Sequence, residues 1–423
     1  MDLFSVFAII STLAALFAFV NQRFLKLPFT IGLMIMALAF TMLVIVIGNW
    51  QPWLMDLSSQ FVSALDFKSL LLDIMLSFLL FAGALHVKFA LLKRNLGPIL
   101  LLATVGVLLS AVLIGGMLYF ILQWLNYPVD FIYCLLFGSM LAPTDPIAVL
   151  SILKEAGAPK NLEVKIVGES LFNDGVGVVV FLALLSIATG SGADFSASEI
   201  GILFLEEVGG GLALGLAGGY LAFRLMRSID HYETEVMLSL ALVMGLYSLA
   251  SALHFSGPLA VVIAGLFIGN KSPAKAWSPN TQLYIDKFWE ILDVFLNAIL
   301  FVLIGMELLV IQLDGFYILL GLLAIPITLL ARYLAVLGPV EYHKERLDFA
   351  PKTALLLTWG GIRGGISIAL ALSLDESMNR DLFLTMAYIV VIFSIIVQGL
   401  SLKKVLKITL KGQDSAKELR SED

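Results

Sequence analysis

Residues 168–177 read Gly-Glu-Ser-Leu-Phe-Asn-Asp-Gly-Val-Gly, and they place two carboxylates, a hydroxyl and a carboxamide inside a long apolar segment. A charged side chain in the hydrocarbon of a bilayer costs about 2.5 kcal/mol or more, so such residues at membrane depth are rare and usually functional. The stretch therefore predicts a membrane-spanning helix that carries a site for charged species.

The composition of the whole chain supports a membrane environment. Hydrophobic residues make up 60% of the 423 residues and charged residues 14%, whereas soluble domains carry about 25% charged residues. The single cysteine, Cys134, excludes an intrachain disulfide and a cysteine-cluster metal site. We expect an all-α polytopic membrane protein with no cofactor and no nucleic-acid partner.

Apolar runs of about 20 residues are long enough to cross the hydrocarbon core as helices. We predict about thirteen such spans and regard the ninth as the weakest, because it is short and opens with Gly257-Pro258. The predicted spans are 3–20, 27–48, 69–91, 97–122, 129–152, 164–187, 199–226, 235–253, 256–270, 288–311, 316–338, 351–374 and 381–402.

The charges of the connecting loops predict the orientation. Alternate connections, starting with 21–26 and ending with the C-terminal tail, contain 22 of the 26 Lys and Arg residues when those at the adjoining ends of the spans are included. Cytoplasmic loops are enriched in these residues. We therefore expect the N-terminus outside and the C-terminus in the cytoplasm.

The fifth and twelfth spans both contain helix breakers. Residues 142–146 read Ala-Pro-Thr-Asp-Pro and residues 360–365 read Gly-Gly-Ile-Arg-Gly-Gly. Proline removes a backbone donor, and each glycine costs a helix about 1 kcal/mol. Corresponding broken helices in two inverted halves are typical of secondary transporters and mark a binding site near the midplane.

This pattern predicts the organisation of the chain. We expect a single transmembrane domain, 1–410, followed by a short polar cytoplasmic tail, 411–423. Within the domain we expect two inverted six-helix repeats, 1–190 and 233–402, joined by a linker helix region, 191–232.

Two aspartates are candidates for the central site. Asp174 lies about ten residues from the cytoplasmic end of its span, or about 15 Å at 1.5 Å per residue, and Asp145 is at a similar depth. Ser170 lies four residues before Asp174, so the two share a helix face. Together with Thr144, these oxygens are the kind that hard cations prefer. A carboxylate in low dielectric also takes up a proton readily, so one group could bind either a proton or a cation.

Two arginines lie within predicted spans. The depth of Arg332 in the eleventh span matches that of Glu169 in the sixth, so we expect a structural ion pair, with snorkelling of Arg332 as the alternative. Arg363 lies between the glycine pairs, where we expect it to offset the partial negative ends of broken helices. Asp73, His86, Asp293 and Glu307 fall near span ends and are interpreted as interfacial.

These motifs resemble those of the NhaP/NHE-type cation/proton antiporters. The resemblance rests on Thr144-Asp145, the run at 168–176, Ala-Arg-Tyr at 331–333 and Trp-Gly-Gly-Ile-Arg-Gly-Gly at 359–365, and it extends over all the predicted spans. It implies an NhaA-like antiporter fold with broken helices that cross at the midplane.

The resemblance also implies roles for individual residues. Asp174 would carry the ion or the proton with Asn173 as its partner, and Thr144, Asp145 and Ser170 would complete the Na⁺ site. Glu169 and Arg332 would form the stabilising pair.

Further expectations follow for the whole protein. The resemblance implies a homodimer in the lipid bilayer, and Asn at position 173 resembles the electroneutral branch with one-for-one exchange. We expect exchange of Na⁺, and also Li⁺, for H⁺ by alternating access, serving sodium and pH homeostasis. The short tail favours a prokaryotic inner membrane.

The sequence departs from the family pattern at one point, and several alternative functions stay open. Many relatives carry an acidic residue in the third span, where this chain reads Leu80-Phe81-Ala82-Gly83-Ala84. K⁺ could replace Na⁺ at the same site, and a channel-like pathway is a further alternative. Two membrane aspartates could also form an intramembrane aspartyl protease, although the Gly-x-Gly-Asp context of those enzymes is absent.

Overall fold

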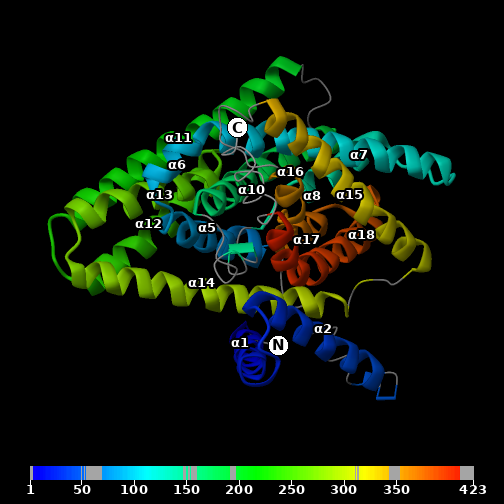
Figure 1. Ribbon diagram of the computed structural model, residues 1–423, viewed down its shortest axis with the longest axis horizontal. Coiled ribbons are helices and arrows are strands. Elements are labelled where there is room, and N and C mark those ends of the chain that lie inside the picture. The colour runs from blue at the N-terminus through cyan, green and yellow to red at the C-terminus, as the bar shows by residue number, and fades with distance from the viewer. Residues whose placement is uncertain are drawn as a thin grey trace, which may run out of the picture.

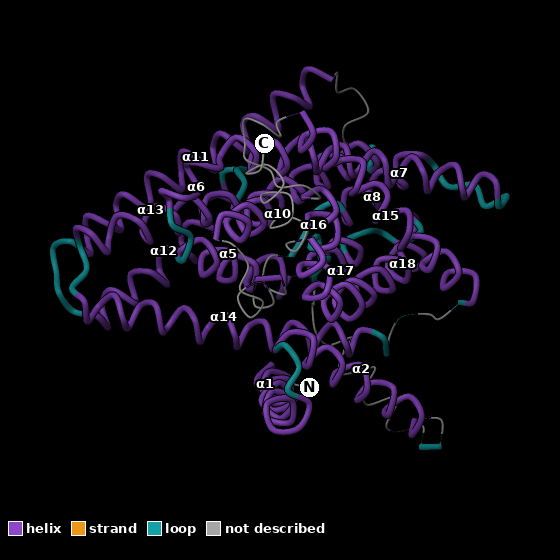
Figure 2. The backbone as a smooth tube through the Cα atoms, in the orientation of Figure 1, coloured by secondary structure: helices purple, strands orange, loops and turns teal. Residues whose placement is uncertain are grey.

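The computed structural model describes residues 3–48, 50, 51, 53, 69–145, 149, 150, 153, 160–190, 197–309, 311, 314–342 and 353–409. Within these ranges all regular secondary structure is helical (Figure 2). The predicted all-α fold is confirmed.

Many helices are long and apolar enough to cross a bilayer. Three shorter apolar helices, Leu70–Leu85, Phe131–Leu141 and Gly257–Ser272, accompany nine long ones in the described part of the chain. The protein is a multi-pass membrane protein, and the number of thirteen crossings stays a prediction. The nine long segments are Phe4–Leu25, Phe29–Gly48, Leu92–Trp124, Leu162–Ala188, Leu205–Met226, Tyr232–Ala252, Pro279–Glu307, Gly315–Glu341 and Arg380–Thr409.

Most helices overlap the predicted spans, but α6 runs through the predicted loop at 92–96 and α14 begins nine residues before its predicted span at 288. The α-helices are α1 (Leu3–Val20), α2 (Phe29–Gly48), α5 (Leu76–Leu85), α6 (Phe89–Leu101), α7 (Val107–Trp124), α8 (Phe131–Leu141), α10 (Lys160–Ala188), α11 (Ala197–Met226), α12 (Tyr232–Ala252), α13 (Gly257–Lys275), α14 (Pro279–Glu307), α15 (Gly315–Tyr342), α16 (Thr353–Trp359), α17 (Gly365–Leu372) and α18 (Arg380–Phe393). Short π-helical segments extend or join several of them, at Asn21–Leu25, Leu70–Met75, Leu102–Gly106 and Ser394–Gln398.

Helix α10 runs through the interior of the bundle (Figure 1). Every residue from 165 to 177 is buried, on all faces of the helix. A helix that is buried all round belongs in a core, and α10 contacts α6, α8 and α13. Helix α14 lies along one edge of the bundle, where α1 and α2 pack against it (Figure 1). The unusual polar stretch of the sequence is therefore at the centre of the molecule.

Both predicted helix breaks are present. Helix α8 ends at Leu141, and residues 142–145 are not helical. Helix α16 ends at Trp359, and α17 begins at Gly365. The second proline of the first break, Pro146, and the predicted tail 411–423 lie outside the described residues.

The weakest predicted span is a helix of 19 residues, α13. Pro258 occupies its first turn, where the missing N–H would have no helical partner in any case. The Ser256 hydroxyl accepts a hydrogen bond of 3.4 Å from the Leu259 N–H and so caps the helix. Gly257-Pro258 therefore starts a helix here.

Candidate cation site

The two broken helices cross next to α10. The Asp145 N–H donates a hydrogen bond of 2.7 Å to the Ile362 carbonyl, so the two non-helical segments pair directly. Pro143 packs against α10 at Gly177, where a side-chain Cβ would lie 3.1 Å from the Pro143 Cδ. The glycine therefore lets the first break lie close to the central helix.

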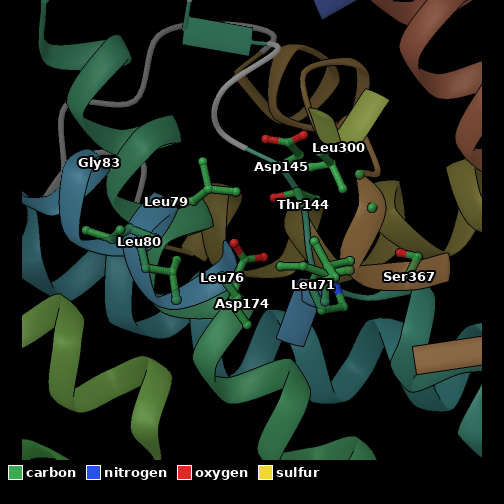
Figure 3. Close-up of a pocket in the computed structure, with 15 residues that line it drawn as sticks. Leu71, Leu76, Leu79, Leu80, Gly83, Thr144, Asp145, Asp174, Leu300 and Ser367 are labelled. Atoms are coloured by element: carbon green, nitrogen blue, oxygen red, sulfur yellow. The ribbon is translucent and has the colours of Figure 1, made fainter. Parts of the chain in front are cut away.

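A cavity opens at this crossing, and Asp145 and Asp174 both line it (Figure 3). The centre of a water-sized sphere can occupy about 60 Å³ of it, and about 10–15 Å³ measured in this way is enough to hold one water. Asp174 is the central residue of α10 and is 4% exposed, and Asp145 is 9% exposed. A small cation with a few waters fits between two buried carboxylates here.

The rest of the cavity wall is largely apolar. Leu76, Leu79, Leu80 and Gly83 of α5 line one side (Figure 3). This segment contributes leucine and glycine to the wall. The charged groups that line the cavity are Asp145 and Asp174 among the residues the structure describes.

Thr144, Ser170 and Asn173 form one buried hydrogen-bond network. The Thr144 and Ser170 hydroxyl oxygens are 2.9 Å apart. Asn173 Nδ2 donates to Thr144 Oγ1 at 2.9 Å, and Asn173 Oδ1 accepts from the Thr144 N–H at 3.3 Å. Thr144 lines the cavity, whereas Ser170 and Asn173 reach it through Thr144. The network fixes the segment that carries Asp145 to the helix that carries Asp174.

Glu169 and Arg332 form a buried ion pair between α10 and α15. Arg332 Nη2 donates to Glu169 Oε1, and both side chains are almost fully buried. Neither residue lines the cavity. The contact places a carboxylate beside a guanidinium that would otherwise be costly to bury.

Arg363 binds the ends of two broken helices at once. Its Nε donates a hydrogen bond of 2.9 Å to the carbonyl of Leu141, the last residue of α8, and its Nη1 donates to the Gly361 carbonyl beyond α16. Carbonyls at a helix C-terminus lack helical partners and carry partial negative charge. The guanidinium is therefore placed to neutralise both ends.

The last span completes this arrangement in a way that the sequence did not indicate. The Ser394 hydroxyl accepts a hydrogen bond of 2.9 Å from the Arg363 N–H and donates to Gln398 Oε1 at 2.5 Å. Gln398 Nε2 then donates at 3.0 Å to the carbonyl of Trp359, the last residue of α16. The feature of the sequence that could have indicated this role is the presence of a serine and a glutamine within an apolar span.

Two further residues at the cavity were also missed. Ser367 of α17 lines the cavity. At Gly364, a Cβ would lie 2.6 Å from Asp145 Oδ2, so this glycine lets the carboxylate approach the start of α17. The sequence alone does not show which serine or glycine beside a helix break takes part in the site.

The interpretation of Glu307 as an interfacial residue is wrong. Glu307 is the last residue of α14, near the predicted end of the span at 311, but it is only 5% exposed and is therefore buried within the protein. The side chain of Asp73 lies outside the described residues.

A comparison with protein families identifies this arrangement. A family model described as "Sodium/hydrogen exchanger, transmembrane" matches residues 9–408. The chain is 45% identical over 419 residues to the Na⁺/H⁺ antiporter NhaP of Pseudomonas aeruginosa, covering 98% of each chain. It is 34% identical to the Na⁺/H⁺ antiporter NhaH of Halobacillus dabanensis, covering 91% of this chain and 93% of the relative.

Solved structures share the fold. The sodium proton antiporter MjNhaP1 of Methanocaldococcus jannaschii superposes with a TM-score of 0.77 at 22% identity, covering 97% of this chain and all of that one. The antiporter fold with crossing broken helices is therefore confirmed for the described residues. By the extent of the family match and by its identity with these relatives, the chain belongs to the sodium/hydrogen exchanger family.

Proposed function

We propose that this protein is an antiporter that exchanges Na⁺, and also Li⁺, for H⁺ across the cell membrane. Membership of the family makes the chain a secondary transporter and not an enzyme. The observation that carries the proposal is the pair of buried carboxylates, Asp145 and Asp174, in one cavity at the crossing of two broken helices.

In the proposed cycle, Asp174 binds either a proton or the cation. An ionised carboxylate that is buried without a counter-charge is strongly disfavoured, so Asp174 is occupied in every state that crosses the membrane. Asp145 and the Thr144 hydroxyl supply further oxygens to the cation, Ser170 contributes beside them, and Asn173 holds Thr144 in place. Competition at one carboxylate then couples the two ions.

The stoichiometry follows from charge counting. If Asp145 keeps the same charge throughout, one proton on Asp174 is replaced by one monovalent cation. Each cycle then exchanges one positive charge for another, which is electroneutral one-for-one transport.

Alternating access requires part of the bundle to move with the site. We assign the repeats to residues 1–190 and 233–402, with 191–232 as the linker, and propose that the site opens to one side at a time. Arg363 holds the ends of the two broken helices together during this movement, and the Glu169–Arg332 pair joins α10 to α15. We also propose a homodimer in a prokaryotic inner membrane, with an outer N-terminus and a cytoplasmic C-terminus.

The test uses purified protein in proteoliposomes with a trapped pH-sensitive dye. Addition of Na⁺ or Li⁺ to an acid-loaded vesicle should move protons outward, and K⁺ should be much less effective. Electroneutral exchange predicts that the rate does not change when a membrane potential is imposed with valinomycin. Absence of cation-driven proton movement with every ion would contradict the proposal, and a preference for K⁺ would assign the site to K⁺/H⁺ exchange.

A further inference from the structure

Ser367 places a hydroxyl in the same cavity as the two aspartates. It lies in the first turn of α17 and is 2% exposed, and it lines the cavity with Thr144, Asp145 and Asp174. In Figure 3 it lies on the side of the cavity away from Leu79 and Leu80. Ser367 is thus an oxygen from the second half of the chain, whereas the other side-chain oxygens of the cavity come from the first half.

The hydroxyl is held in one orientation. Ser367 Oγ donates a hydrogen bond of 2.7 Å to the Met140 carbonyl in the last turn of α8. A serine hydroxyl has one proton and two lone pairs. With its proton committed to Met140, the oxygen presents lone pairs and no proton to any further partner. This is the orientation that a cation ligand needs.

The close approach of Asp145 to α17 places the carboxylate near this hydroxyl. A Cβ at position 364 would lie 2.6 Å from Asp145 Oδ2. Gly364 is the residue directly before α17 and Ser367 is the third residue of that helix, so the carboxylate lies against the end of the helix that carries the hydroxyl. Both residues line the same cavity, which an ion bound there would share.

Thr144 and Ser367 carry the neutral side-chain oxygens among the described residues that line the cavity. The Thr144 hydroxyl already accepts a hydrogen bond from Asn173 and pairs with Ser170. The leucines of α5 offer no ligand, and hard cations need several oxygens around them.

We propose that Ser367 is a further cation-binding residue, whose hydroxyl oxygen binds the transported monovalent cation together with Asp145 and Asp174. This inference rests on the proposed antiport function. It adds a ligand from the second broken helix to those of the first.

The experiment compares Ser367→Ala with Ser139→Ala in proteoliposomes. Ser139 is a matched control, because it is buried and its hydroxyl donates a hydrogen bond of 2.7 Å to the Leu136 carbonyl, but it does not line the cavity. Loss of one neutral ligand, worth about 0.5–1.5 kcal/mol, predicts a rise of about two- to tenfold in the apparent KM for Na⁺. Ser139→Ala should keep the wild-type KM, and Ser367→Thr, which keeps the hydroxyl, should restore it.

A second variant separates ligation from folding. Ser367→Cys keeps the size of the side chain and a weak donor toward Met140, but its soft sulfur is a poor ligand for Na⁺. It should raise the KM as Ser367→Ala does. The melting temperature of both variants, measured against Na⁺ concentration, should need correspondingly more Na⁺ for the same stabilisation.

The possible failures are distinguishable. If wild-type protein shows no cation-driven proton movement, the proposed function fails. If wild-type protein exchanges ions and Ser367→Ala or Ser367→Cys keeps its KM and its Na⁺ stabilisation, only the assignment of Ser367 is overturned.

Discussion

Asn173 holds Thr144 by both the backbone and the side chain. Its Oδ1 accepts a hydrogen bond of 3.3 Å from the Thr144 N–H, and its Nδ2 donates one of 2.9 Å to the Thr144 hydroxyl. Thr144 precedes Asp145 in a segment with no helical hydrogen bonds of its own. A single carboxamide on α10 thereby positions the first broken helix against the helix that carries Asp174.

We expect Asn173→Ala to weaken both folding and ion binding. The change leaves the buried Thr144 N–H without this acceptor, at a cost of about 1–3 kcal/mol, and it releases the segment that carries Asp145. Melting temperature and apparent KM for Na⁺ should both worsen. Asn297→Ala is the control, because Asn297 is equally buried but donates to Asp293 of its own helix. An unchanged Na⁺ affinity in Asn173→Ala would contradict this positioning role.

Removal of one partner of the Glu169–Arg332 pair should be strongly destabilising. Glu169→Leu leaves a buried guanidinium without its carboxylate, which costs about 3–5 kcal/mol. The double variant Glu169→Leu/Arg332→Leu removes both charges and should recover part of the loss. Glu290→Gln breaks an exposed pair with Lys287 and should melt close to wild type. If Glu169→Leu also melts close to wild type, the pair does not stabilise the fold.

Arg363→Lys should impair the protein although it keeps the charge. The guanidinium donates to the carbonyls of Leu141 and Gly361 from two different nitrogens. A lysine ammonium has one nitrogen and cannot reproduce this two-point geometry. We expect a lower melting temperature and a lower exchange rate. The more exposed Arg380 is the control, and Arg380→Lys should behave like wild type. Wild-type behaviour of Arg363→Lys would show that charge alone suffices.

Gly364→Ala should disturb the position of Asp145. The added methyl would lie 2.6 Å from Asp145 Oδ2 and 2.8 Å from its Cβ, so the aspartate or the start of α17 must shift. Overpacking of this kind costs about 1–3 kcal/mol, and we expect loss of most Na⁺-driven exchange. Gly245→Ala, in the open middle of α12, meets no atom within 4 Å and should keep full activity. Full activity of Gly364→Ala would mean that Asp145 does not need this approach.

Much of the fold could be predicted because the bilayer constrains it. Apolar runs of fixed length and the alternation of loop charge give helix positions that agree with α1, α2 and α10 to within a few residues. Breaks within helices can be predicted equally well, since proline and paired glycine act on the backbone locally. The ends at Leu141 and Trp359 therefore fell where the sequence indicated.

Of the residues at the site, mainly the charged ones could be predicted from the sequence. Asp145, Asp174, Glu169 and the two arginines stand out because ionisable residues are costly in hydrocarbon. Ser367 and Ser394 do not, because hydroxyls are common in membrane helices and their role depends on which carbonyl lies opposite. Glu307 was misjudged for a related reason, since its position at a helix end says nothing about what packs over that end.

The central claim is that Asp174 carries the proton and the cation in turn. The most direct measurement is Na⁺-driven proton movement in proteoliposomes that contain Asp174→Asn, with melting temperature as the test of folding. In wild-type protein a lower pH should raise the apparent KM for Na⁺, because protons compete for the same carboxylate. The account predicts that Asp174→Asn is folded and moves no protons in response to Na⁺. Exchange by this variant at a rate near that of the wild type would contradict it.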